Sequence, residues 1–236
     1  MPNGPLSLST IGFDADDTLW QNEQFFKLTQ ARFAALLKEH AEPDHIGERL
    51  LEAEKRNLRL YGYGIKGFTL SMIETALEVT EGRAPGSVVE EILSFGREML
   101  AHPVETLPHA RATLETLAGA YRIVLITKGD LFDQERKLAQ SGLGELFDAV
   151  EIVSEKSAET YEKIFKRHGD GAGRSMMVGN SLRSDVLPAI EAGGWGVFVP
   201  HELTWVLEHA EEPSDAPRFR RLDHLGELTR LIEEIG

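Results

Sequence analysis

The sequence has no cysteine and no long apolar run, and each absence excludes a class of protein. Without cysteine the chain forms no disulfide and has no thiolate to act as a nucleophile or metal ligand. No segment approaches the roughly 18 consecutive apolar residues of a membrane-spanning helix. The first five residues, Met1–Pro5, contain neither a basic region nor an apolar stretch, unlike a secretion signal. We therefore expect a cytoplasmic protein with no membrane partner.

Positive charge is also scarce in this chain of 236 residues. There are 25 lysines and arginines against 39 aspartates and glutamates, which gives a formal net charge of -14. Such an acidic surface argues against a nucleic-acid partner. It does not exclude a small anionic substrate, because a metal ion and a few lysines can reverse the sign of the potential locally. The sequence leaves the oligomeric state undetermined.

Apolar strands alternate with helical patterns in most of the chain. A run of β-branched residues at 122–127 is typical of a parallel strand buried on both faces. The expected strands cover about 8–13, 122–127, 150–153, 175–178 and 195–199, with helices at 110–118, 131–141, 158–168, 185–192 and 225–235. This alternation predicts an α/β fold with a doubly wound, Rossmann-like parallel sheet.

Residues 21–103 contain helical patterns only. The expected helices cover about 23–40, 46–60, 69–80 and 88–100, and a glycine-rich loop at 61–67 separates the second from the third. We expect an inserted helical cap at 21–103 over the carboxyl edge of a core formed by 1–20 and 104–236. The loop carries Tyr63 and Lys66, which are candidates for substrate selection; the alternative is a plain interhelical turn.

Three aspartates crowd the end of the first expected strand. Asp14 and Asp16 fall on one face of an extended chain, because side chains alternate there. Neighbouring carboxylates repel each other, and a divalent cation commonly offsets that cost. Asp17 is explained equally well as a helix cap and as a member of this acidic cluster.

Polar residues also follow the other apolar runs. Thr127 and Lys128 end the second, Lys156 follows the third, and a turn from Gly179 to Asp185 follows the fourth. In open parallel sheets, ligands bind beyond the carboxyl ends of the strands. We therefore expect these residues to gather with Asp14 around one site. Taken singly, each also has an ordinary explanation as a turn, cap or surface residue.

The pattern resembles the haloacid dehalogenase-like superfamily. The segment from Asp14 to Leu19 matches its D-x-D-x-T-L signature, and Thr127 and Lys156 match its second and third motifs. The turn from Gly179 to Asp185 matches the fourth motif, and the helical insert resembles the family's C1 cap.

The resemblance implies an Mg²⁺-dependent phosphatase of a small phosphorylated metabolite. Asp14 would be the nucleophile that forms an aspartyl-phosphate, and Asp16 the general acid and base. Thr127, Lys128 and Lys156 would bind the phosphoryl group. The implied metal ligands are Asp14, the backbone carbonyl of Asp16, and Asn180 or Asp185.

The chain departs from the family's pattern at two positions, and three other functions stay open. Asn180 stands where an aspartate ligand is usual, and Lys128 where an asparagine is common. The alternatives are a 2-haloacid dehalogenase, a phosphomutase, and a catalytically weak regulatory or binding protein. Asp16 argues against the dehalogenase, which needs no acid for an ester's leaving oxygen. Asn180 favours the weak binding protein.

Overall fold

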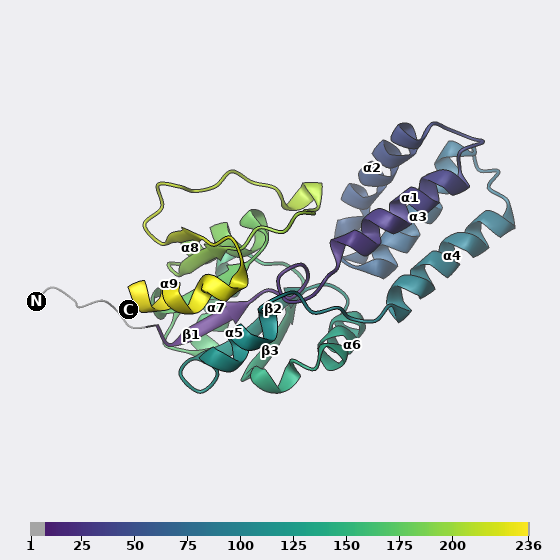
Figure 1. Ribbon diagram of the computed structural model, residues 1–236. Coiled ribbons are helices and arrows are strands. Elements are labelled where there is room, and N and C mark those ends of the chain that lie inside the picture. The colour runs from purple at the N-terminus through teal and green to yellow at the C-terminus, as the bar shows by residue number, and fades with distance from the viewer. Residues whose placement is uncertain (1–7, 236) are drawn as a thin grey trace, which may run out of the picture. The chain divides into compact units, whose positions relative to one another are not determined.

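The computed structural model describes residues 8–235, and its core is one parallel sheet (Figure 1). The strand order is β3-β2-β1-β4-β5-β6, and every neighbouring pair is parallel. The strands are β1 (Thr10–Phe13), β2 (Arg122–Lys128), β3 (Ala149–Val153), β4 (Ser175–Gly179), β5 (Trp195–Phe198) and β6 (Phe219–Arg221). The expected α/β fold is confirmed. The expected core also included residues 1–7 and 236. These residues, and with them the Met1–Pro5 segment, lie outside the described part of the chain.

The two central strands are buried throughout. All four residues of β1 and all five of β4 are buried, as expected for strands covered on both faces. Gly12 allows this close packing, since a Cβ there would lie 2.7 Å from Cδ1 of Ile126. The edge strand β6 was not expected, because it has three residues and two of them are arginines.

Helices cover both faces of this sheet. Ile11, Phe13 and Leu125 share one apolar cluster with residues of α5 and α9, while Val124 and Ile126 share another with α7. The helices of this part are α5 (Ala110–Leu117), α6 (Leu131–Ser141), α7 (Ala158–His168), α8 (Leu187–Glu191) and α9 (Leu228–Ile235). The helix expected at 185–192 instead begins as one wide turn, Leu182–Val186, before α8.

Residues Gln24–Pro103 and Gly129–Glu135 form a second compact unit, which we call the helical unit. The rest of the described chain, 8–23, Val104–Lys128 and 136–235, forms the core unit. The helical unit is built on α1 (Glu23–Leu36), α2 (Pro43–Tyr61), α3 (Ile65–Val79) and α4 (Gly86–Ala101). It has its own apolar core, which includes Phe33, Ile46, Phe68, Met72 and Phe95.

The glycine-rich loop of the helical unit is shorter than expected. Tyr61 ends α2 and Ile65 begins α3, so only Gly62–Gly64 connect them. The expectation of a loop over 61–67 was therefore wrong, and Lys66 lies in the first turn of a helix. The two glycines have positive φ angles, 72° and 110°, which glycine adopts at little cost.

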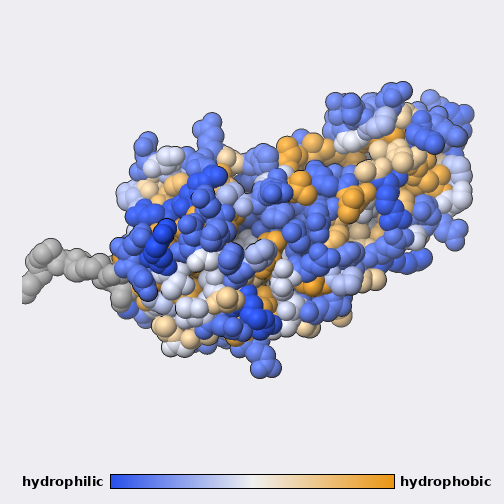
Figure 2. Space-filling model, viewed as in Figure 1, coloured by the Kyte–Doolittle hydropathy of each residue, from blue (hydrophilic) through white to orange (hydrophobic). Residues whose placement is uncertain are grey.

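Hydrophilic residues cover much of the face drawn in Figure 2, in keeping with the charged composition. Among residues 8–235, no helix combines the length and the hydropathy that crossing a membrane would require.

Candidate active site

Asp14 leaves the central strand β1 at its carboxyl end. Its backbone N–H donates to the carbonyl of Val178 on β4, at 2.9 Å, which extends the sheet pairing by one residue. The carboxylate is buried, and its Oδ1 lies 2.5 Å from Nζ of Lys156. The sheet therefore fixes the backbone of Asp14, and Lys156, from the segment after β3, holds its side chain.

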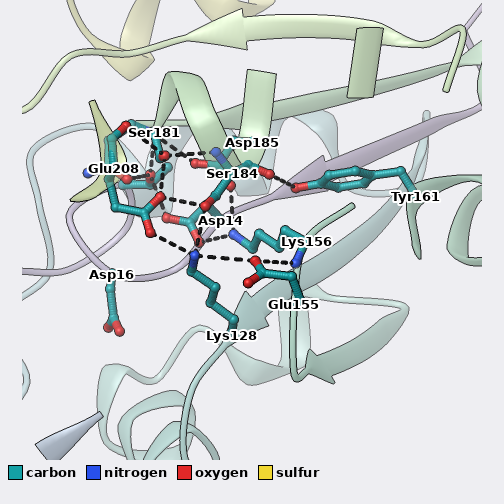
Figure 3. Close-up of polar contacts among 12 residues, drawn as sticks. Asp14, Asp16, Lys128, Glu155, Lys156, Tyr161, Ser181, Ser184, Asp185 and Glu208 are labelled. Carbon is teal, nitrogen blue, oxygen red and sulfur yellow. Dashed lines mark hydrogen bonds and ion pairs between the residues drawn. The ribbon is translucent and has the colours of Figure 1, made fainter. Parts of the chain in front are cut away.

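Lys156 joins Asp14 to a second buried carboxylate. Its Nζ also contacts Asp185 (Figure 3), at 2.6 Å from Oδ1. Only 2% of the Lys156 side chain is exposed. Burial, and then the charge of Asp185, raise the pKa of Asp14 to about 7, although Lys156 acts in the opposite direction. Burial alone would lower the pKa of Lys156, but the two carboxylates outweigh it and raise that pKa. Two carboxylates sharing one ammonium leave a net negative charge when both are ionised, which favours a further cation.

The second oxygen of Asp14 faces Thr18 and Asn180. Thr18 Oγ1 donates to Asp14 Oδ2 at 3.1 Å and accepts from the backbone N–H of Asn180, also at 3.1 Å. The inward atom of the Asn180 amide lies 3.1 Å from Asp14 Oδ2 and 3.2 Å from the backbone oxygen of Asp16. Both neighbours are acceptors, so without a cation the amide nitrogen faces inward and donates to them.

This arrangement fits the ligands that Mg²⁺ takes. With the amide oxygen of Asn180 inward, that oxygen, Asp14 Oδ2 and the Asp16 carbonyl oxygen converge at the 3.1 and 3.2 Å spacings just given. Oxygens about 2.1 Å from an octahedral Mg²⁺ ion lie roughly 3 Å apart. Among residues 8–235, no cluster of three His, Cys, Asp or Glu side chains suits a metal. The three oxygens described here are not such a cluster, because only one of them belongs to a carboxylate and the others to an amide and a backbone carbonyl.

The turn after β4 holds Asp185 in place. Asp185 Oδ2 accepts from the backbone N–H of Ser181 at 3.0 Å, so its two oxygens have separate partners. A Cβ at Gly179 would lie 2.2 Å from the same Oδ2, and only glycine leaves that space. Sequence reasoning left open whether Asn180 or Asp185 faces the metal. In the structure Asp185 binds Lys156, and Asn180 contacts Asp14.

The carboxylate of Asp16 points away from this cluster (Figure 3). It accepts from Lys137 Nζ, at 2.9 Å to Oδ1 and 3.1 Å to Oδ2, and from Trp20 Nε1 at 2.7 Å. Lys137 also donates to Asn22 Oδ1 at 2.8 Å. Sequence reasoning missed Lys137, because one lysine in an amphipathic helix gives no signal.

Asp17 serves as a helix cap, one of its two expected roles. Its carboxylate accepts from the backbone N–H groups of Asn22 and Glu23, where α1 begins. Its backbone has a φ of 59°, in the left-handed region. Burial raises the pKa of Asp17 to about 6, although nearby His201 acts in the opposite direction.

Thr127 and Lys128, the two predicted residues at the end of β2, have different surroundings. Thr127 is buried, with 1% of the residue exposed. Lys128 is the last residue of the strand, and its Nζ lies 2.7 Å from Glu208 Oε1. Sequence reasoning missed Glu208 because it lies 80 residues further along the chain, within an irregular segment.

Tyr63 and Lys66 belong to the helical unit. Lys66 Nζ lies 2.9 Å from Asp130 Oδ2 and 5.9 Å from the ring centre of Phe132, all within that unit. Phe132 is strongly exposed, with 78% of its surface accessible. Lys66 therefore lies among surface residues of mixed charge and apolar character.

The sequence model of the haloacid dehalogenase-like hydrolase family matches residues 8–193. The chain belongs to this family. This haloacid dehalogenase-like hydrolase is similar to glyceraldehyde 3-phosphate phosphatase of Methanothermobacter thermautotrophicus. The two sequences are 30% identical over 84% of this chain and 88% of the relative.

Solved structures agree on the fold of this haloacid dehalogenase-like hydrolase. A family member from Xanthomonas campestris has 41% identity and a TM-score of 0.87 over 97% of this chain and 92% of that one. A magnesium-bound hydrolase of this superfamily, YfnB from Bacillus subtilis, has 16% identity and a TM-score of 0.65 over 96% of this chain and 99% of its own.

Proposed function

We propose that this hydrolase is an Mg²⁺-dependent phosphatase that acts on a small phosphorylated metabolite through an aspartyl-phosphate on Asp14. One observation carries the proposal. The Asp14 carboxylate has a buried ammonium 2.5 Å from one oxygen, while its other oxygen faces the Asn180 amide at 3.1 Å. One end is thus held by a cation, and the other lies beside further oxygen ligands.

The reaction assigns a separate task to each residue. A carboxylate oxygen of Asp14 attacks phosphorus, so an oxygen–phosphorus bond forms as the ester P–O bond breaks. Asp16, protonated at this stage, gives its proton to the leaving oxygen. Asp16, now ionised, then takes a proton from a water molecule as the water oxygen bonds to phosphorus. The bond between phosphorus and the Asp14 oxygen breaks, which releases phosphate and free Asp14. For these steps the Asp16 carboxylate turns from its contacts with Lys137 and Trp20.

The proposed metal ligands are Asp14 Oδ2, the carbonyl oxygen of Asp16 and the amide oxygen of Asn180. When bound, Mg²⁺ supplies positive charge that offsets the repulsion between carboxylate and phosphoryl oxygens. Lys156 favours the ionised form of Asp14, and with Thr127 and Lys128 it binds the phosphoryl oxygens. Magnesium bound to YfnB supports the choice of metal.

Substrate choice is assigned to the helical unit as a cap. The relative that is named as a glyceraldehyde 3-phosphate phosphatase supports a small phosphorylated substrate. Sugar phosphates, nucleotides and phosphoglycolate-like acids are the classes to compare, because the fold does not specify a ligand. Tyr63 and Lys66 are the cap residues proposed to distinguish them.

Phosphate release from an aryl phosphate, with Mg²⁺ and with a chelator, tests the chemistry. We expect turnover that depends on Mg²⁺, followed by a preference for one class in a panel of phosphorylated metabolites. Chloride release from a 2-haloacid without phosphate release would instead identify a dehalogenase. Binding without turnover of any ester would identify a regulatory member of the fold.

A further inference from the structure

A closed ring of hydrogen bonds lies at the carboxyl ends of β2 and β4 (Figure 3). Lys128 Nζ donates to Glu208 Oε1 and to Ser184 Oγ, each at 2.7 Å. The other oxygen of Glu208 accepts from Ser181 Oγ at 2.6 Å and from Ser184 Oγ at 2.5 Å. One carboxylate therefore holds the lysine of one strand end to two serines of another.

This ring is almost buried. The exposed fractions of the Lys128 and Glu208 side chains are 13% and 14%. Burial acts to raise the pKa of Glu208, but Lys128 and the two serines outweigh it, so the net pKa lies below the ordinary value. The ion pair therefore keeps Glu208 charged.

Glu208 comes from a segment that the family resemblance did not single out. It ends the short helical turn Val206–Glu208, in the irregular stretch between β5 and β6. A second carboxylate, Glu155, lies 3.6 Å from Lys128 Nζ, beyond hydrogen-bond distance, and its side chain is 57% exposed. Of these two acidic neighbours, Glu208 has the shorter and better shielded contact.

We propose that Glu208 is a positioning residue, which fixes the ammonium of Lys128 where it binds an oxygen of the phosphoryl group. The inference rests on the proposed function. A lysine side chain has four rotatable bonds, and its ammonium is a point charge without the fixed geometry of a guanidinium. Two short hydrogen bonds to Glu208 and Ser184 remove that freedom before substrate arrives, which is preorganisation.

A double-mutant cycle tests whether Glu208 acts through Lys128. The variants are Glu208→Ala, Lys128→Met and the two combined, assayed for KM and kcat on an aryl phosphate with Mg²⁺. We expect Glu208→Ala to raise KM about fivefold with a smaller change in kcat, and to add nothing once Lys128 is methionine. Additive effects, or a KM that falls because Glu208 competes with the phosphoryl group, overturn the proposal.

A conservative variant separates positioning from a merely structural role. Glu208→Gln keeps an acceptor oxygen for Lys128 and points an amide at two hydroxyls, which can accept, so it should restore most of the KM lost in Glu208→Ala. Glu155→Gln is the matched control, because it removes an exposed charge near the same lysine, and its KM should stay near that of the wild type. Equal losses in the glutamine and alanine variants of Glu208 contradict the proposal.

Calorimetric titration with inorganic phosphate in the presence of Mg²⁺ needs no turnover. Phosphate should bind the Glu208→Ala variant about fivefold more weakly than the wild type. If the wild type hydrolyses no ester yet shows this difference, the proposed function fails and the role of Glu208 stands. If the wild type binds no phosphate, or both proteins bind it equally, the role of Glu208 is refuted.

Discussion

Lys156 and Asp14 meet across 142 residues of sequence, with 2.5 Å between Nζ and Oδ1. The lysine also binds Asp185, so one ammonium serves two buried carboxylates. A neutral asparagine occupies the position next to Gly179, where the family usually has a third acid. The region around Asp14 therefore carries one negative charge fewer than the family pattern implies. Single substitutions at these positions should show how much this charge matters for catalysis and metal binding.

Asp14→Asn should reduce hydrolysis of an aryl phosphate by at least about a thousandfold, because an amide oxygen does not form the covalent intermediate. The measurement is phosphate release with saturating Mg²⁺. Asp170→Asn is a matched control, since it makes the same change at a side chain that is 56% exposed. Activity of the Asp14 variant within tenfold of wild type would show that Asp14 is not the nucleophile.

Asn180→Asp should tighten Mg²⁺ binding by about tenfold, or ~1.4 kcal/mol, because a carboxylate replaces a neutral ligand oxygen. Isothermal titration of the chelator-treated protein measures this directly. Gln140→Glu, at an exposed residue of α6, adds the same charge outside the proposed ligand set and should leave the titration unchanged. An unaltered Mg²⁺ affinity in the Asn180 variant would place its amide outside the coordination sphere.

Lys66→Ala should change the ranking of substrates more than the rate on a small aryl phosphate. The substitution breaks the ion pair with Asp130, at 2.9 Å, on the surface of the proposed cap. Rates over a panel of phosphorylated metabolites provide the measurement. Lys163→Ala, which removes another exposed lysine that is paired on its own helix, is the control. A uniform loss on every substrate would speak against selection by Lys66.

The ion pair of Glu208 should make stability depend on pH in a defined direction. The pKa of Glu208 is lowered in the folded state, so its stabilising contribution is complete above the ordinary value of about 4.3 and is lost as the pH falls through the lower folded-state value. The difference in melting temperature between wild type and Glu208→Gln should thus be constant above pH 5 and shrink below it. Glu233→Gln, which makes the same substitution at an exposed site, is the control. A difference that grows on acidification would reverse the assigned sign.

The pattern of apolar residues in the sequence was sufficient to predict most of the strands and helices. The β-branched run at 122–127 and the apolar run of β4 identify strands because burial on both faces demands apolar side chains at every position. The edge strand β6 escaped because Arg220 and Arg221 dominate its three residues. Helix α3 starts before its expected position, since glycines at 62 and 64 mark a turn without showing where the next helix begins.

The candidate site was predictable where residues follow directly after strands. Asp14, Lys156 and Asp185 meet as expected, because parallel strands bring their carboxyl ends to one edge. The contacts of Asp16 were not predictable, since period-two alternation holds only while the chain stays extended. Its partner Lys137 comes from a helix, and a linear sequence does not specify which helical residue reaches back to a strand end.

Gly179 lies so close to Asp185 that even a methyl group would overlap the carboxylate. Alanine at this position would displace Asp185 from Lys156 without altering any formal charge. The addition of one uncharged methyl group would therefore weaken the ion pair between Asp185 and Lys156, although Lys156 lies far from Gly179 in the sequence. The lack of a side chain at Gly179 thus limits which substitutions this turn can accept while Asp185 stays in contact with Lys156.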